Sequence, residues 1–501
     1  MSKRPRIRAL WAATGIVAAI VSVGSAAAAT SGTHLAVQPQ AAQAPSASVA
    51  EWLTTPGSDT ATTAQLPLQY GITPGPALVE VDPNIKYQTV SGFGAAITDS
   101  AAHVLYGLDD ANRAKVMSNL FSPTAGAGIS FLRQPIGASD FVADTDYSFD
   151  DMPPGQTDYS LSHFSIAHDQ TQILPLLRQA LKLNPSLQIV ATPWSPPGWM
   201  KTGDSMIDGK LIDSPAIYHA YAEYLVKFLQ AYQAAGVHVD YLTVQNEPQA
   251  LQRNNYPGTD LDWQQEAKVI DALGPMIRAA GLNTKILGYD HNWSEHPGDV
   301  KTHEQANEDP ELNYPYDLLE SSANRWIYGT AYHCYAGDPT AQTPLKASFP
   351  DKPLLMDECE GGDISTILGV MQNWGTGSID WNIALNQNNG PHVGGCGTCN
   401  GTITINSQTE AVTYNDQYRD IEHFSKFVPT GSVHIGGTVS DSSANPISAV
   451  AFLDPNHTTT VVAYNPGDTT RTFTVVDGGE SFSATLTAGA RATYQWRATR
   501  S

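Results

Sequence analysis

The sequence contains few cysteines and few basic residues. Its 501 residues include four Cys, and 27 Lys and Arg stand against 49 Asp and Glu, which gives a formal net charge of −22. Such an excess of negative charge makes the surface repel nucleic acids and anionic lipids. We therefore expect no nucleic-acid partner, and a neutral substrate fits best.

Long hydrophobic runs are also missing beyond the N-terminus. The one such run, "ALWAATGIVAAIVSVGSAAAA", follows basic residues and ends in small side chains, which predicts a signal peptide over residues 1–29 with cleavage near Ala27 to Ala29. An uncleaved membrane anchor is the alternative, but the run is rich in Ala and a low-complexity linker over residues 30–50 follows it. We expect a secreted, extracellular monomer without stable membrane insertion.

Metal-binding patterns are missing as well. No HExxH occurs, and the 14 histidines form no convincing ligand set, so we expect no metal and no cofactor. Cys396 and Cys399 lie in "GGCGTC", and in an exported chain this CxxC favours a local disulfide over a zinc site. Cys334 and Cys359 stand in separate strand-like runs without the paired spacing of a zinc module.

What the sequence does contain, from about residue 85 to 425, is an alternation of amphipathic helices and short apolar strands. In "DSPAIYHAYAEYLVKFLQAYQAAG", Asp213 or Ser214 caps a helix, Pro215 suits its first turn and Gly236 suits its end. Eight strand candidates are nearly continuous in apolar character, as parallel strands buried on both faces should be. They are "TVSGFG", "GISFLRQP", Leu187–Thr192, "VDYLTVQNEP", "KILGYD", "WIYGTAYH", "KPLLMDE" and "GSIDWNIAL".

Eight such units in one chain favour an α/β fold, the (β/α)8 TIM barrel, over an open sheet. We place the barrel at residues 83–430. After it, over residues 431–501, the pattern changes to alternating β-branched and aromatic residues with Gly, Asn and Asp turns, as in "VVAYNP" and "RTFTVV". This predicts a small β side domain, to which residues 51–82 contribute N-terminal strands.

Polar or aromatic residues stand at the carboxyl end of each predicted strand. In a (β/α)8 barrel these ends line one mouth, where enzymes of this fold carry out their chemistry. None of these side chains is an ordinary core residue. In chain order they are Asp99, Arg133, Trp194, Asn246 with Glu247, Asp290, His333, Glu358 and Trp381.

Two glutamates at these ends form a candidate catalytic pair. Glu247, in "VQNEP", ends the fourth strand and Glu358, in "LLMDECEGG", ends the seventh, so the two can flank a bound molecule. Cleavage of a glycosidic bond needs such a pair, about 5 to 5.5 Å apart in a retaining enzyme. Asp357 and Glu360 are alternatives to Glu358, although strand alternation allows at most one of Asp357 and Glu358 to point into the mouth.

Several ordered motifs resemble those of glycoside hydrolase family 30, the group that includes glucosylceramidases and microbial endo-β-1,6-glucanases. The resemblance covers roughly residues 78 to 430 and implies that the C-terminal β-region is the family's β-sandwich side domain. The motifs are "VSGFGAAITDSAA", "LFSPTAGAGISFLRQPIGASDF", "TPWSPPGWMKTG", "TVQNEP", "AYHCYAGD", "DECEGG" and "DWNIALNQNNGP".

The resemblance implies a retaining double displacement with Glu247 as acid/base and Glu358 as nucleophile. It implies that four residues hold the sugar at the cleavage point: Asp99, Trp194, Asn246 and Trp381. It also implies that His333 and Tyr335 orient the nucleophile, and Arg133 fits a supporting role on a carboxylate.

Simpler structural roles remain open for several of these residues. Asp99 could be a helix N-cap, Trp194 could pack against prolines, and Trp381 and His333 could belong to the core. Cys334 stands where many relatives carry a bulkier aromatic residue, which leaves that part of the wall undefined.

The loops "GGCGTCNG" and "TPWSPPGWMKTGDSM" resemble the microbial endo-β-1,6-glucanase branch more than the xylanase branch, so β-1,6-glucan is the expected substrate. A glucosylceramidase and an endo-β-1,6-galactanase are alternatives with the same catalytic pair. A non-catalytic carbohydrate-binding protein is a more distant one, which the presence of both glutamates disfavours.

Overall fold

The structure is a computed structural model of the chain, and it describes residues 48–58, 62–67, 69–70, 75, 77–250 and 255–497. The predicted signal peptide and nearly all of the predicted linker lie outside these ranges. Within them, each helix is too short or too polar to traverse a lipid bilayer.

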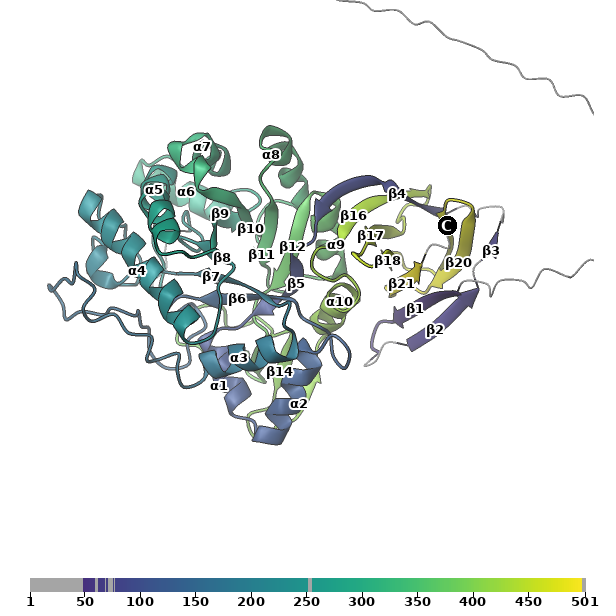
Figure 1. Ribbon diagram of the computed structural model, residues 1–501, viewed down its shortest axis with the longest axis horizontal. Helices are drawn as coiled ribbons and strands as arrows, with labels where there is room; N and C mark the ends of the chain where they lie inside the picture. Colours follow the sequence, from purple (N-terminus) through teal and green to yellow (C-terminus); the bar gives the residue numbers. More distant parts are fainter. Residues whose placement is uncertain are drawn as a thin grey trace, which may run out of the picture. The chain divides into compact units, whose positions relative to one another are not determined.

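Eight parallel strands close into a barrel, each hydrogen-bonded to its neighbours in chain order and the last to the first (Figure 1). All eight predicted strands are present, so the predicted (β/α)8 barrel is confirmed. The last prediction ran too far, because "GSIDWNIAL" divides into a barrel strand and a separate short strand. The barrel strands are β5 (Gly92–Ala96), β6 (Phe131–Pro135), β7 (Gln188–Thr192), β8 (Tyr241–Thr243), β9 (Lys285–Asn292), β10 (Ile327–His333), β11 (Leu354–Glu358) and β12 (Gly375–Asp380).

Helices surround the barrel and bury their apolar faces against it. Ser214 stands at the N-cap position of α4, but its side chain forms no capping hydrogen bond. As predicted, Pro215 is the first residue of α4, and Gly236, with φ +82°, lies just past its end. The helices are α1 (Asp99–Tyr106), α2 (Asp110–Phe121), α3 (Ile173–Leu183), α4 (Pro215–Ala234), α5 (Trp263–Ala279), α6 (Pro297–Ala306), α7 (Tyr314–Glu320), α8 (Gln342–Ser348), α9 (Ile364–Gln372) and α10 (Asp416–Ser425), with 3-10 turns at Gly198–Met200, Ser322–Arg325 and Pro339–Ala341.

The barrel interior changes from apolar to polar between one layer of inward-facing side chains and the next. Strands β6 to β12 each place one residue in a buried apolar layer: Phe131, Val190, Tyr241, Leu287, Ala331, Leu355 and Ile379. Because alternate residues of a strand point to the same face, the residue two positions further on also points inward. In six of these strands that position is Arg133, Thr192, Thr243, His333, Asp357 or Trp381, all buried. The carboxyl end of the barrel is therefore built as a polar layer.

Strand β5 contributes glycine instead of a large side chain to this interior. Gly94 lies so close to β6 that a Cβ atom would meet the Phe131 carbonyl oxygen at 1.9 Å. Only glycine permits this approach between the two strands.

A ten-stranded sheet from both ends of the described chain forms the β side domain and encloses a second apolar core. In Figure 1 the purple strands β1 and β2 lie beside the yellow C-terminal strands, because β1 pairs with β21. β1 begins at Ser48 and β4 continues to Thr89, on either side of the predicted range 51–82. The strands are β1 (Ser48–Thr54), β2 (Thr62–Pro67), β3 (Gln69–Tyr70), β4 (Ala77–Thr89), β16 (Val433–Asp441), β17 (Ser448–Leu453), β18 (Thr458–Tyr464), β19 (Arg471–Asp477), β20 (Glu480–Leu486) and β21 (Arg491–Arg497).

A small third sheet follows the last barrel strand and was not foreseen from the sequence. It consists of β13 (Ala384–Asn386), β14 (Ile403–Ile405) and β15 (Val412–Tyr414). Because β13 and β14 pair with each other, they hold together the two ends of the loop that contains "GGCGTC".

Helix α10 connects the barrel to the β side domain through buried polar contacts. Asp420 Oδ1 forms an ion pair with Arg491 Nε of β21, at 2.6 Å. The two ring nitrogens of His423 lie 2.9 Å from the Thr54 hydroxyl and 2.8 Å from that of Thr493. Buried polar groups are costly unless paired, so these contacts specify how α10 meets strands β1 and β21.

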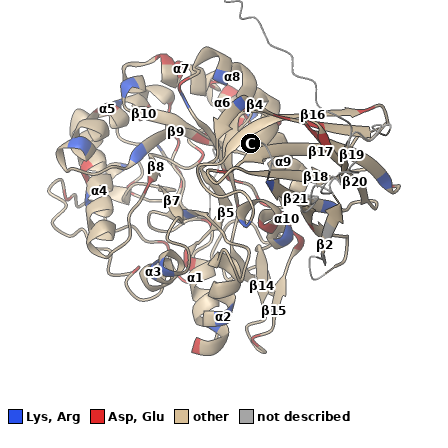
Figure 2. Cartoon of the chain, turned by 45° about the vertical axis from the view of Figure 1, so that its right-hand side comes forward, with Lys and Arg blue, Asp and Glu red and all other residues tan. Residues whose placement is uncertain are grey.

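Charged residues are distributed as the composition indicates. In the view of Figure 2, Lys and Arg stand singly on the helices around the barrel, interspersed with Asp and Glu, and form no continuous band. This distribution gives no basic surface for a polyanion in that view.

Replacing one buried glutamate tests how the barrel is supported. Glu266 of α5 is 2% exposed and accepts from the Tyr289 backbone N–H of β9 at 3.1 Å. Burial raises the pKa of Glu266 to about 7. The folded protein therefore retains a proton that the unfolded chain releases near its ordinary value, and this group's contribution to stability is lost as pH rises towards 7.

Glu266→Gln keeps an acceptor for Tyr289 but cannot ionise. We expect its unfolding free energy, measured by denaturant titration from pH 4 to 8, to rise relative to the wild type by an amount on the order of 3 kcal/mol across that range. Glu304→Gln, at an exposed position on α6, is the control and should show no such trend. If the difference in unfolding free energy between Glu266→Gln and the wild type does not change with pH, the raised pKa of Glu266 is contradicted.

Candidate active site

A fully buried guanidinium lies at the centre of the polar layer. Arg133 of β6 donates through Nη1 to Glu358 Oε2 and through Nη2 to Asp290 Oδ1 at 3.0 Å and Asn246 Oδ1 at 2.8 Å. Its Nε lies 3.5 Å from Asp357 Oδ2. Side chains from β6, β9, β11 and the segment after β8 therefore meet at this one cation.

Aromatic rings cover the same guanidinium. Trp194 and Trp381 stack on each other, with ring centroids 5.0 Å apart, and the guanidinium carbon of Arg133 lies 4.9 and 5.6 Å from the two rings. Cation–π attraction adds to the ion pairs at this depth, because Arg133 is fully buried away from bulk solvent.

Irregularities in two strands bring the acids to Arg133. Pairing of β10 with β11 jumps from Tyr332–Met356 to His333–Glu358, which leaves Asp357 as a bulged residue. Pairing of β10 with β9 makes the same jump at Asp290, which has φ +58°. A bulge re-aims side chains that strict alternation would separate, so Asp357 and Glu358 both reach the guanidinium.

Glu247 does not end a strand as the sequence predicted. Strand β8 stops at Thr243, and Glu247 lies four residues further on with φ +43°. Its backbone N–H donates to the Asp290 carbonyl at 2.9 Å, and that of Asn246 donates to the Pro193 carbonyl at 2.8 Å. Beyond β8, the chain thus remains hydrogen-bonded to the ends of both neighbouring strands. Glu247 has a positive φ, which in a non-glycine residue is often found at functional sites.

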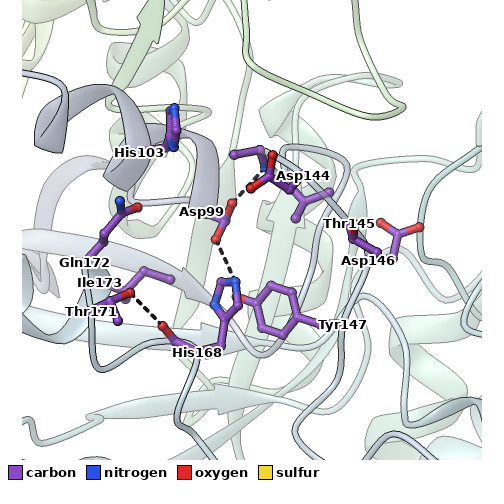
Figure 3. Close-up of a pocket in the computed structure, with 12 residues that line it drawn as sticks. Asp99, His103, Asp144, Thr145, Asp146, Tyr147, His168, Thr171, Gln172 and Ile173 are labelled. Carbon is purple, nitrogen blue, oxygen red and sulfur yellow. Dashed lines mark hydrogen bonds and ion pairs between the residues drawn. The ribbon is translucent and has the colours of Figure 1, made fainter.

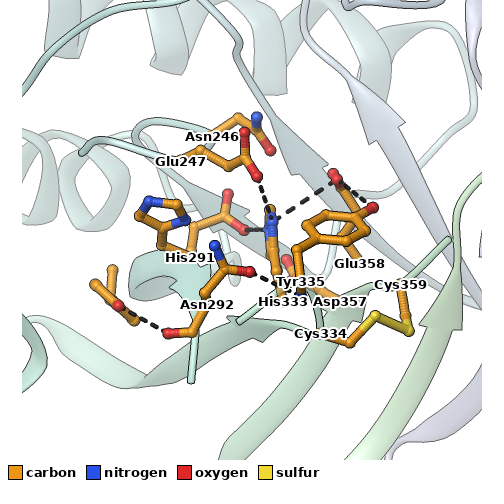
Figure 4. Close-up of polar contacts among 12 residues, drawn as sticks. Asn246, Glu247, His291, Asn292, His333, Cys334, Tyr335, Asp357, Glu358 and Cys359 are labelled. Atoms are coloured by element: carbon orange, nitrogen blue, oxygen red, sulfur yellow. Dashed lines mark hydrogen bonds and ion pairs between the residues drawn. A yellow bond between two sulfur atoms is a disulfide. The ribbon is translucent and has the colours of Figure 1, made fainter. Parts of the chain in front are cut away.

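Both glutamates approach the same imidazole, as Figure 4 shows. His333 Nδ1 lies 3.4 Å from Glu247 Oε1 and 3.7 Å from Glu358 Oε1. The two distances together limit the separation of these two oxygens to about 7 Å, which admits the about 5 to 5.5 Å of a retaining pair. Tyr335 donates to Glu358 Oε1 at 2.9 Å, so each oxygen of Glu358 has its own donor.

The ionisation of the neighbours follows from these contacts. Burial alone would raise the pKa of Asp290, but Arg133 and His333 lower it to about 2. Burial and the adjacent Asp290 raise the pKa of Asp357 well above its ordinary value. Burial would lower the pKa of His333, but Glu358, Asp290 and Glu247 raise it to about 10. Arg133 and His333 therefore favour the charged form of Asp290, whereas burial favours the neutral form of Asp357.

The glutamates open into a cavity of about 460 Å³ at the mouth. Of the predicted sugar-binding residues, Tyr335 and Trp381 line it. Asn246, His333 and Trp194 lie beneath its wall, at most 5% exposed, where they contact Arg133 or Glu247. The full lining is Asp140, Glu247, Tyr256, His291, Asn292, His296, Asp299, Tyr335, Glu358, Glu360, Trp381, Cys396 and Cys399. Direct sugar contacts by the covered residues stay predictions.

Asp99 lies in the wall of a second cavity, shown in Figure 3. Its Oδ1 accepts from the Ala143 backbone N–H at 2.8 Å, and its Oδ2 lies 3.5 Å from His168 Nε2, whose ring stacks on Tyr147. The N-cap of α1 is Thr98, not Asp99, so the alternative considered from the sequence is wrong. The predicted contact between Asp99 and a sugar stays a prediction.

The predicted disulfide between Cys396 and Cys399 is confirmed. A second disulfide joins Cys334 to Cys359, and the sequence reading missed it. Each of these cysteines follows a site residue, His333 or Glu358, on neighbouring strands in register. The signal was present, since two cysteines one residue past the ends of adjacent barrel strands must lie close together.

Other cavity residues were also missed. His291, Asn292 and His296 come from "DHNWSEH", immediately after Asp290, and Glu295 in the same motif lies 3.1 Å from the Tyr289 hydroxyl. Four polar residues at and just beyond the end of β9 could have indicated this wall. Asp140 and Tyr256 come from long loops and carry no periodic signal.

Comparison with known proteins matches this architecture. Residues 90–363 match the glycosyl hydrolase family 30 TIM-barrel domain, and residues 431–494 match the glycosyl hydrolase family 30 beta sandwich domain. The chain belongs to glycoside hydrolase family 30. It is therefore a glycosidase with the family's TIM barrel and β-sandwich.

Relatives in family 30 cover most of the chain. The endo-1,6-β-D-glucanase neg1 of Aspergillus fumigatus is 34% identical over 75% of this chain and 78% of its own length. The lysosomal acid glucosylceramidase of Mus musculus is 29% identical over 84% and 83%. The solved structure of the endo-β1,6-glucanase BT3312 superposes with a TM-score of 0.78 at 31% identity and covers 91% of this chain and 100% of that one.

The family 30 cavity allows a test of the loop that closes it. Cys396 and Cys399 line the cavity, and Cys399 packs with Trp381 in one buried cluster. Without the disulfide, the loop that forms this side of the cavity is less constrained. A substrate longer than one sugar would contact this loop. We expect Cys396→Ser with Cys399→Ser to lower kcat/KM on an oligosaccharide about tenfold, and less on a small aryl glycoside.

Gly397→Ala is the matched control, because its new Cβ has open space in the same loop and the bridge remains. Equal losses on both substrates, or an equal loss in Gly397→Ala, would contradict a role of the bridge in the wall. Steady-state kinetics on the two substrates provides the measurement.

Proposed function

We propose that the protein is a secreted, retaining endo-β-1,6-glucanase that acts by double displacement. The observation that carries the proposal is the pair of glutamates, Glu247 and Glu358, both within 4 Å of His333 Nδ1 at the barrel mouth. Glu358 is fixed by Arg133 and Tyr335, whereas Glu247 lies on a segment that reaches over the mouth.

In the first step, Glu358 attacks the anomeric carbon while Glu247 gives its proton to the leaving oxygen. The bond to the leaving group breaks as the bond to Glu358 forms. His333 beside both carboxylates favours the negative charge that Glu247 acquires in this step.

In the second step, Glu247 takes a proton from water, and the resulting hydroxyl displaces Glu358 from the sugar. Two inversions give net retention of the β configuration. Tyr335 and Trp381, at the cavity wall, are placed to contact the sugar, and an aromatic face suits the apolar face of a pyranose ring.

The relatives support β-1,6-glucan as the substrate. Three endo-1,6-β-D-glucanases are 33% to 35% identical to the chain, whereas the glucosylceramidases are 25% to 29% identical. The loop "GGCGTCNG", on which the expected substrate was based, lines the cavity through Cys396 and Cys399. The strong negative charge of the chain agrees with a neutral glucan.

Export is supported by the basic and apolar N-terminal sequence and by two disulfides, since disulfides persist in oxidising compartments. We also propose that the protein is a monomer. Its barrel spans residues 83–430, and its side domain spans residues 431–501 together with strands from residues 51–82.

A substrate panel tests the function. We expect purified protein to release oligosaccharides of mixed length from β-1,6-glucan, with much slower release from β-1,6-galactan, xylan and glucosylceramide, as followed by chromatography of the products. Glu358→Gln, which removes the nucleophile and keeps its shape, should show loss of at least about a thousandfold in kcat. Preferred cleavage of glucosylceramide or galactan, or release of single glucose units alone, would overturn the assignment.

A further inference from the structure

Three side chains at the mouth form a group with the geometry of a metal site. Glu247, His291 and His333 come from the segment after β8, from β9 and from β10, and each offers one ligand atom within 4.8 Å of the other two. In Figure 4, Glu247 lies above the central imidazole of His333 and His291 lies to its left. Neighbouring parallel strands end at the same edge of the barrel, which explains why these residues meet.

The donor set selects a class of metal ion. Two imidazole nitrogens and one carboxylate oxygen are the three protein ligands of many open zinc sites. Imidazole suits Zn²⁺, Cu²⁺ and Ni²⁺, whereas Mg²⁺ and Ca²⁺ prefer oxygen ligands alone. The group therefore favours a borderline transition metal over the hard cations.

The contact behind His333 also matches a metal site. His333 Nε2 lies 2.9 Å from Asp290 Oδ1, whereas His291 Nε2 lies 3.8 Å from Glu295 Oε2, beyond hydrogen-bond distance. In metal sites a carboxylate commonly holds the far ring nitrogen, which fixes the tautomer and turns the other nitrogen towards the ion. On His333 that other nitrogen, Nδ1, is the one that faces Glu247 and Glu358.

An ion can reach this group from solvent, because Glu247 and His291 line the open cavity. Glu358 Oε1, 3.7 Å from His333 Nδ1, or a water from the cavity can supply a fourth ligand. An ion bound to Glu247 competes with the proton that the acid/base must carry.

We propose that Glu247, His291 and His333 form a reversible inhibitory site for zinc-class divalent cations. The inhibition rests on the proposed acid/base role of Glu247, whereas the binding itself does not. Bound zinc occupies the Glu247 carboxylate, which must carry the proton that is given to the leaving group. Turnover therefore stops until the ion leaves.

Calorimetric titration and inhibition kinetics test this proposal. Wild-type protein prepared without a histidine tag and treated with EDTA should bind one Zn²⁺ per chain, and Zn²⁺ should inhibit turnover until EDTA is added again. Mg²⁺ at the same concentration should neither bind nor inhibit. In His291→Gln, both the Zn²⁺ affinity and the sensitivity to inhibition should fall by about tenfold or more.

His296→Gln is the matched control, because His296 lines the same cavity outside the group of three. It should retain the wild-type affinity for Zn²⁺, and His291→Asn replaces His291→Gln if the latter does not fold. Absence of Zn²⁺ binding in the wild type, equal binding by the His291 and His296 variants, or equal inhibition by Mg²⁺ would overturn the site. Binding needs no substrate, so failure of the glucanase assignment shows separately, as zinc-free enzyme that does not cleave the glucan panel.

Discussion

The buried guanidinium of Arg133 is the constraint on which the rest of the site depends. A cation in the barrel interior would cost several kcal/mol without partners, and loss of one partner from a buried pair costs about 3–5 kcal/mol. Arg133 is paired with Asp290 and Glu358, lies beside Asp357, and is covered by two tryptophan rings. The polar layer is therefore a matched set, in which each side chain is held by the others.

This matched set fixes the geometry of the two glutamates. Arg133 and Tyr335 hold Glu358, and His333, itself held by Asp290, lies between Glu358 and Glu247. Glu247 is held through its backbone, by the bond to the Asp290 carbonyl and a positive φ. Such preorganisation lets the charges that develop during bond cleavage meet partners already in place. The same closeness of imidazoles and carboxylate creates a site that a zinc-class ion can occupy.

The regular parts of the fold could be predicted from the sequence, because barrel strands buried on both faces leave short apolar runs such as "PLLM". The irregular parts could not. The end of β8 at Thr243 and the bulges at Asp290 and Asp357 are set by pairing with neighbouring strands and leave no mark in the composition.

The same limit explains which site residues could be predicted. Glu247 and Glu358 were found because each stands at the end of a predicted strand. The Cys334–Cys359 disulfide was missed although both cysteines follow the ends of neighbouring predicted strands. Asp99 follows the first strand, yet its carboxylate turns to the loop at Ala143. Side-chain direction at a strand end is a property of the tertiary contacts, which one sequence does not encode locally.

The central claim is that Glu358, held by Arg133, is the nucleophile and Glu247 the acid/base. The most direct measurement is the anomeric configuration, by NMR, of the azide product that Glu247→Ala forms from an activated aryl β-glucoside. Glu358 would still form the glycosyl-enzyme, and azide, which needs no general base, would displace it to give the β-glucosyl azide. An α-glucosyl azide from Glu247→Ala would mean that azide replaces a missing nucleophile, and it would contradict the account.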